Sequence, residues 1–184
     1  MNTIFRKKGT RRRTFFVGAL LLFFSLTAWN SQAVTTTVTF DNPVPPGSSF
    51  DLLNGIFQGM DFGIGSWRWE GPYNVDPTNH IFFDSSAGTS RTFTFSPAPK
   101  VLNSMLVFTS GNGTLTLTDN AGQTITQAVT TGSMQTVTTG WTLGATTITV
   151  SFTSGWNLGI DDIVYSDPVT TNPPVLTITA PTAI

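Results

Sequence analysis

A succession of short β-type runs, each bounded by turn residues, constrains the fold of this chain more than any other feature. Thr114–Thr118 alternates hydroxyl and apolar residues, as in a strand with one wet face, between the hairpin-type turns Gly111–Gly113 and Asp119–Gly122. The runs in this half are Val101–Thr109, Thr114–Thr118, Thr124–Thr130, Met134–Thr138, Thr146–Phe152 and Leu158–Tyr165. Many short strands at regular spacing, with no amphipathic helix among them, predict an all-β fold, an antiparallel β-sandwich.

The first half of the chain carries weaker signals of the same kind. Five further strands are expected, at Val34–Phe40, Gly55–Phe62, Ser66–Glu70, His80–Asp84 and Arg91–Phe95. Together the two halves predict one sandwich domain over residues 34–166.

Residues 1–33 have the parts of a secretory signal peptide. Six of the nine basic residues precede the apolar run Phe15–Ala28, and Ser31-Gln32-Ala33 is typical of a cleavage site. A membrane anchor is the alternative, and Arg12-Arg13 also fits a twin-arginine signal. We therefore expect a secreted or extracellular protein, with the cell surface and the periplasm as the alternatives.

Removal of this segment changes the charge of the chain. Three basic and ten acidic residues remain, so the net charge moves from −1 to 3 − 10 = −7. An acidic surface argues against nucleic acid as a partner. The absence of cysteine excludes disulfides and thiolate metal sites.

The composition shifts again after Tyr165. Residues 167–174 form a proline- and threonine-rich linker, and residues 175–184 begin a new strand that cannot fold alone. We expect this strand to open an Ig-like domain, followed by further domains of a longer chain. The sandwich itself is expected to be a monomeric module.

The closing run contains two adjacent aspartates, Asp161 and Asp162, among apolar residues. Strict alternation places one of them on the face of Leu158 and Ile160, where a carboxylate is costly unless it is paired or bound to a metal. Asp41 and Asn42 offer further oxygen ligands if the ends of the domain meet. The alternative is that the aspartates cap turns by accepting backbone N–H groups.

Thr39-Phe40-Asp41 and Gly159–Ile163 resemble the opening and closing strands of secreted bacterial carbohydrate-binding modules of the galactose-binding-like kind. The resemblance implies a jelly-roll β-sandwich. It also implies a structural calcium ion near the first and last strands, held by Asp161 and Asp41 with Asp162 beside them.

The segment Gly65–Asn74 is rich in aromatic and polar residues. Trp67 and Trp69 share one face of a strand, and Arg68 the other. The Trp pair either stacks on a sugar or fills the core, and the core is favoured because Arg68 and Glu70 need the wet face. The candidate ligand-binding residues are Trp67, Arg68, Trp69, Tyr73, Asn74 and Asn79. Trp141 and Trp156 are expected to plug strand ends.

Nothing in the sequence favours catalysis. Glu70 is the sole glutamate, no spacing supplies its partner carboxylate, and His80 is expected in a loop or at a rim without a triad motif. We therefore predict an exported, non-catalytic module that binds a polysaccharide or other glycan. An adhesive surface module without a ligand site, and a polysaccharide hydrolase or lyase, are the alternatives.

Overall fold

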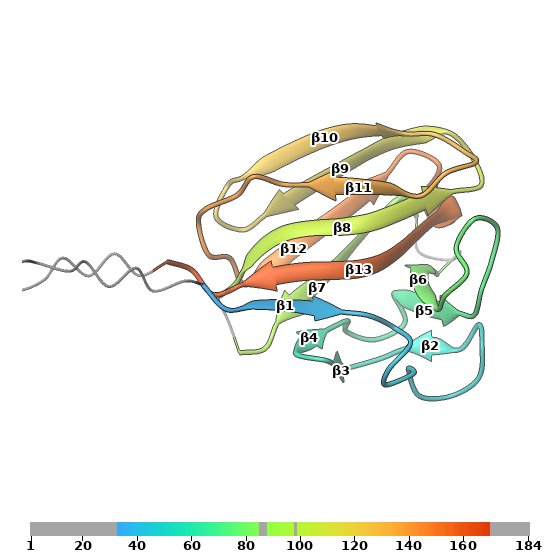
Figure 1. The fold of residues 1–184 in the computed structure, drawn as a ribbon, viewed down its shortest axis with the longest axis horizontal. Helices are drawn as coiled ribbons and strands as arrows, with labels where there is room; N and C mark the ends of the chain where they lie inside the picture. The colour runs from blue at the N-terminus through green and yellow to red at the C-terminus, as the bar shows by residue number, and fades with distance from the viewer. Residues whose placement is uncertain (1–32, 85–87, 98, 170–184) are drawn as a thin grey trace, which may run out of the picture. The chain divides into compact units, whose positions relative to one another are not determined.

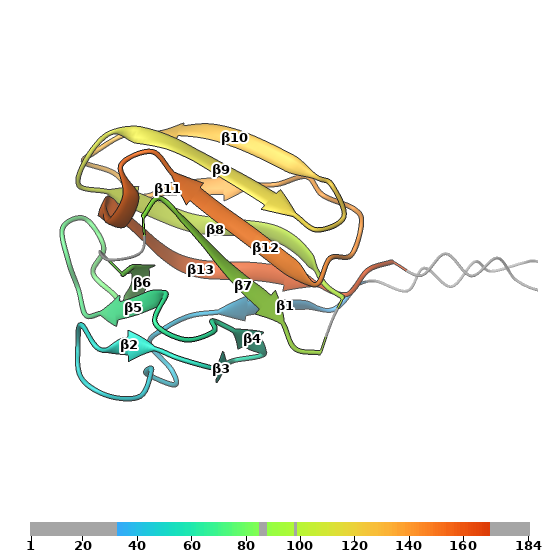
Figure 2. The ribbon, with the colours of Figure 1, turned by 180° about the vertical axis from the view of Figure 1, so that it is seen from behind.

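The computed structural model describes residues 33–84, 88–97 and 99–169, which fold into two facing antiparallel sheets. The predicted antiparallel β-sandwich is therefore confirmed (Figures 1 and 2). The signal peptide, most of the linker and the Ig-like strand lie outside the described residues. Within the described ranges, no helix has the length and apolar character needed to cross a membrane.

Sheet A is formed by seven strands, of which six follow the order β11-β8-β13-β6-β5-β2, while β1 pairs with β13. Their bounds are β1 Thr35–Val38, β2 Leu52–Leu53, β5 Trp67–Glu70, β6 His80–Phe83, β8 Val101–Thr109, β11 Gln135–Thr138 and β13 Leu158–Ser166. The opening strand thus lies against the closing one, with Val38 opposite Ile163.

Sheet B has the strand order β10-β9-β12-β7-β4-β3. Its strands are β3 Ile56–Phe57, β4 Met60–Asp61, β7 Ser90–Phe95, β9 Gly113–Asp119, β10 Thr124–Val129 and β12 Thr147–Phe152. From β8 onward the chain passes repeatedly between the sheets, which is the wrapping of a jelly roll. A short 3-10 helix, η2, spans Gly155–Asn157 and leads into β13.

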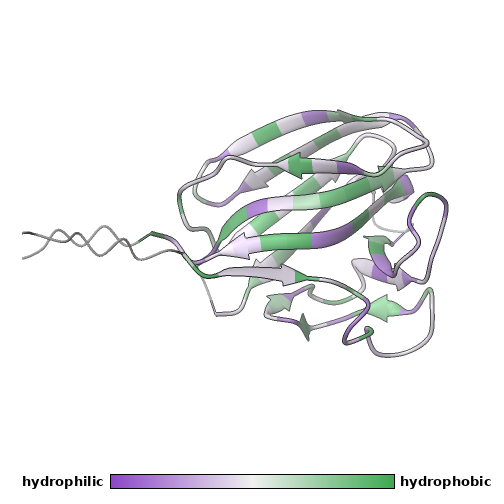
Figure 3. Cartoon of the chain, in the orientation of Figure 1, coloured by the Kyte–Doolittle hydropathy of each residue, from purple (hydrophilic) through white to green (hydrophobic). Residues whose placement is uncertain are grey.

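The core between the sheets is made by the alternate residues that the sequence pattern selects. Leu115, Leu117, Ile148 and Val150 from sheet B face Met105, Val107 and Ile160 from sheet A, and all are essentially inaccessible to water. Apolar and polar segments alternate along β8 and β13 in Figure 3. The burial of this apolar surface is the main stabilising contribution to the fold.

The expected strand Gly55–Phe62 is wrong in one respect, because it is a tight hairpin of β3 and β4. Gln58 and Gly59 have positive φ values of 46° and 80° and form its two-residue turn. A turn with two left-handed residues matches the twist of paired strands, and glycine adopts such a backbone without strain. The sequence pattern missed this turn because glutamine rarely occupies its first position.

The expectation that residues alternate strictly between the two faces along the closing strand is also wrong. A β-bulge between Asp161 and Val164 interrupts the pairing of β13 with β8, and Asp162 has a φ of 44°. The core therefore receives Ile160 and then Ile163, three residues apart instead of two. The extra residue keeps both aspartates out of the hydrophobic core between the sheets, although Asp161 is still only 3% exposed.

Candidate functional site

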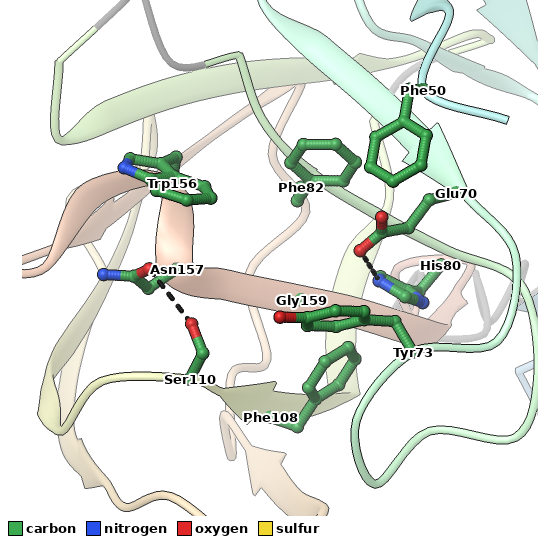
Figure 4. Close-up of a pocket in the computed structure, with 10 residues that line it drawn as sticks. All are labelled: Phe50, Glu70, Tyr73, His80, Phe82, Phe108, Ser110, Trp156, Asn157 and Gly159. Carbon is green, nitrogen blue, oxygen red and sulfur yellow. Dashed lines mark hydrogen bonds and ion pairs between the residues drawn. The ribbon is translucent and has the colours of Figure 1, made fainter.

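The outer face of sheet A carries a pocket built on strands β5, β6, β8 and β13. Its cavity volume is about 130 Å³. Half of the ten residues that line it carry phenyl, phenol or indole rings: Phe50, Tyr73, Phe82, Phe108 and Trp156 (Figure 4). Phe50, Tyr73 and Trp156 expose 58%, 52% and 57% of their surface, so their rings are open to a ligand.

Strand register explains why these rings gather. Gly159 lies opposite Phe82 on one side and opposite Phe108 on the other, so the three residues form one row across the sheet. A Cβ atom on Gly159 would lie 2.2 Å from Cζ of Phe108, which shows that the phenylalanine ring occupies the place of the missing side chain. Phe108 is only 2% exposed although it stands apart from the core between the sheets.

The polar side of the pocket is an array of buried groups behind the rings. His80 is 1% exposed, and its Nε2 lies 3.0 Å from Oε1 of Glu70. Its Nδ1 faces Oδ2 of Asp76 at 3.4 Å and the Thr78 carbonyl oxygen at 3.5 Å. His80 is thus a buried strand residue between two carboxylates, and the expectation of a loop or rim histidine is wrong.

At the rim, Ser110 Oγ lies 3.0 Å from Oδ1 of Asn157 and donates to it (Figure 4). Beside the pocket, Phe50, Arg68, Phe82 and Trp156 line a second, open hollow. Arg68 donates to Asp84 and to the Phe50 carbonyl oxygen. These contacts hold the Phe50 loop next to Phe82, whose ring it meets edge to face at 6.2 Å.

The structure corrects part of the candidate ligand set from the sequence. Trp67 and Trp69 are 0% and 5% exposed, and their indole N–H groups donate to the Thr92 and Pro46 carbonyl oxygens, so they occupy the core. The core alternative therefore holds, because buried rings offer no face to a sugar.

Of the remaining candidate ligand-binding residues, two lie at the pocket or beside it and two do not. Tyr73 lines the pocket and Arg68 lines the neighbouring hollow. Asn79 donates to the Phe40 carbonyl oxygen, and Asn74 is exposed in a left-handed turn with a φ of 58°. These two asparagines lie in the loop between β5 and β6, and neither is among the residues that line the pocket.

Sequence reasoning missed Phe50, Phe82 and Phe108, and placed Trp156 at a strand end as a plug. Trp156 is exposed because the 3-10 helix η2 turns its ring outward, over the pocket. Gly159 was the usable signal, since a glycine inside a strand often marks the close approach of another group.

The candidate metal residues lie near one another and next to Asp76, which also faces His80. Asp161 is 3% exposed; burial raises its pKa to about 6, with smaller contributions from the charges of Asp162 and Asp76. Burial and the charges of Asp41 and Asp76 raise the pKa of Asp162. Thr78 Oγ1 lies within hydrogen-bond distance of both Asp76 and Asp161, at 2.5 and 2.9 Å, and has one proton to donate.

These oxygens suit calcium chemically, and Oδ2 of Asp76 is buried without a hydrogen-bond partner among the residues that the structure describes. However, no three acidic or histidine side chains in the part of the chain that the structure describes are arranged to hold a metal ion. Asp161 accepts the backbone N–H of Asp162, which is the kind of contact that the turn-capping alternative predicts for the two closing-strand aspartates. Asp41 accepts the backbone N–H of Asn79.

The arrangement defines a β-sandwich domain with an aromatic pocket on one outer face. No protein-family model matches the chain, and no curated protein matches it in sequence. Among solved structures it is similar to two mutants of CBM29-2, a family 29 carbohydrate-binding module. Each has a TM-score of 0.41 and 11% sequence identity; the match covers 74% of this chain and 94% or 93% of the other.

Proposed function

We propose that this domain is a non-catalytic module that binds a carbohydrate in the aromatic pocket of sheet A. One observation carries the proposal: Trp156 and Tyr73, each more than half exposed, flank a cavity that also contains polar groups. Sugar rings present C–H faces that pack on aromatic rings, and hydroxyls that need fixed hydrogen-bond partners. Glu70, Ser110 and Asn157 supply such partners.

The pocket chemistry favours binding over hydrolysis. A glycosidase needs two carboxyl groups facing each other across the bond to be broken. Among the described residues that line the pocket, Glu70 is the single carboxylate, and its Oε1 is engaged with His80. We therefore propose recognition without bond cleavage.

Affinity electrophoresis and calorimetry against a panel of soluble polysaccharides test the proposal. The purified domain is expected to be retarded by at least one of them, and Trp156→Ala and Tyr73→Ala to lose about tenfold or more in affinity. Leu143→Ala is the matched control, because Leu143 is as exposed as Trp156 but does not line the pocket. If the folded protein binds no polysaccharide, the adhesive module without a ligand site becomes the better hypothesis.

We also propose a structural calcium ion near Asp41, Asp161 and Asp162. The support is the crowding of these carboxylates: burial first, and then the charges of Asp41 and Asp76, raise the pKa of Asp162, and a divalent cation would relieve the repulsion. Binding would require these side chains to turn toward a common point. Calcium is expected to raise the melting temperature and EDTA to reverse the rise; an unchanged melting curve removes the proposal.

Export completes the proposal and rests on residues 1–33 of the sequence alone. Expression of the full chain with a periplasmic and a cytoplasmic reporter fused at its end tests it. Mass spectrometry of the mature N-terminus shows whether cleavage follows Ala33.

A further inference from the structure

The charge of the aromatic pocket restricts which sugars it accepts. Glu70 is 8% exposed, and one of its carboxylate oxygens accepts from His80. A carboxylate has room for several hydrogen bonds, and Figure 4 draws the second oxygen of Glu70 on the side away from His80. Glu70 therefore offers a ligand an acceptor with negative charge.

The groups behind Glu70 do not neutralise it. His80 lies between Glu70 and Asp76, with Nε2 at 3.0 Å and Nδ1 at 3.4 Å from their oxygens. Two carboxylates face this one imidazole, so a positive charge on His80 balances only one of the two negative charges that they carry when ionised. The buried position of these groups strengthens the field at the pocket.

The side chains that line the pocket also favour a positively charged ligand group. The faces of aromatic rings carry negative potential and attract cations, and five such rings line the pocket together with Glu70. No lysine or arginine is among the pocket-lining residues that the structure describes. The guanidinium of Arg68 lines the adjoining hollow and is paired with Asp84.

We propose that the pocket accepts a protonated amino group, and that the glycan recognised is an amino-sugar polymer with free amines, of the glucosamine type. This inference rests on the proposed carbohydrate function. A cavity of about 130 Å³ holds a few water-sized groups, so it fits a ring substituent better than a whole disaccharide. The sugar ring then lies over the open hollow, against Trp156 and Phe82.

Calorimetry with three oligosaccharides of the same length and β-1,4 linkage tests the inference, at a pH at which the amines are protonated. The oligomers are those of glucosamine, N-acetylglucosamine and glucose. We expect the glucosamine oligomer to bind about tenfold tighter than either neutral oligomer, with an advantage that shrinks as salt is added.

The outcomes separate this inference from the function on which it rests. Equal affinity for all three oligomers, or preference for a neutral one, overturns amine recognition and leaves carbohydrate binding standing. Failure of all three oligomers and of the polysaccharide panel overturns both.

Two variants tie the preference to its residues. Glu70→Gln removes the charge and keeps an acceptor for His80, so the affinity ratio between the glucosamine and glucose oligomers is expected to fall toward one. Tyr73→Leu keeps an apolar side chain but removes a ring, and is expected to lower the ratio severalfold. Because Glu70 is buried, melting curves check that Glu70→Gln folds. If both folded variants keep the original ratio, the inference is wrong.

Discussion

The two outer faces of the sandwich follow the same alternation rule and differ in what they expose. On sheet B the outward residues are mostly threonines, and neighbouring hydroxyls meet directly: Thr116 with Thr126 at 3.4 Å and Thr118 with Thr124 at 3.2 Å. On sheet A the outward residues include Phe82, Phe108 and the buried pair Glu70 and His80.

The difference is one of cost. A threonine on a strand packs its methyl group on neighbours and leaves its hydroxyl to water, so the face of sheet B is satisfied by solvent. Solvent does not satisfy the outer face of sheet A in the same way. Its aromatic rings bury the neighbouring carboxylates, and the cost of burying those charges must be offset by hydrogen bonds. A fold retains such an arrangement more readily where it serves recognition, which is why we place the ligand on sheet A.

The largest expected effect is a difference in stability between substitutions on the outer faces of sheet A and sheet B. Phe108→Ala removes a ring that is 2% exposed and is expected to cost about 3 to 5 kcal/mol of unfolding free energy. Thr116→Ala, on the outer face of sheet B, is expected to cost less than about 1 kcal/mol. Urea denaturation measures both; equal losses would show that the outer face of sheet A is no better packed than that of sheet B.

The second prediction concerns the acidic end of sheet A. The pKa of Asp161 is about 6 in the folded protein and 3.8 in the reference state, so the folded protein keeps a proton that the unfolded chain releases. Asp161 therefore contributes most to the free energy of unfolding below about pH 4, and this contribution is lost as the pH rises to about 6.

Asp161→Asn removes this dependence and keeps an acceptor for the Asp162 N–H. In EDTA the variant is expected to gain up to about 3 kcal/mol over the wild type above about pH 7, and nothing below about pH 4. Denaturation across this pH range measures the gain. With calcium present the sign reverses if the proposed ion binds, because the variant then lacks a ligand.

A matched pair of glycines gives the third prediction. Added Cβ atoms would lie 2.2 Å from the Phe108 ring at Gly159 and 2.5 Å from the Phe152 ring at Gly113. Gly159→Ala and Gly113→Ala are each expected to cost about 1 to 3 kcal/mol through overpacking. Only Gly159→Ala should weaken glycan binding, because only its phenylalanine lines the pocket. Calorimetry measures the glycan affinity of the two variants side by side. A similar loss of affinity in both variants would mean that strain in the whole domain, and not the pocket, weakens binding.

The sequence predicted the strands from Val101 to Tyr165 to within one or two residues, because one wet face imposes a clear period of two. It did not predict the pocket, for a physical reason. Phe82 and Phe108 belong to continuous apolar runs, in which period alone does not say which ring faces the core. Phe50 and Trp156 lie outside the strands, where no period applies. The bulge after Asp161 was hidden too, since one extra residue leaves the composition unchanged.

The smallest expected effect tests the passive role assigned to sheet B. Thr149 lies at the centre of its outer face, opposite Thr118 on one side and Thr92 on the other. Thr149→Val keeps the branched shape that suits a strand and removes a hydroxyl that water can replace. We expect the unfolding free energy to change by no more than about 0.5 kcal/mol and the glycan affinity to stay the same. A clear loss of affinity would mean that the hydroxyl rows of sheet B also contact a ligand, and the division of labour between the two faces would then be wrong.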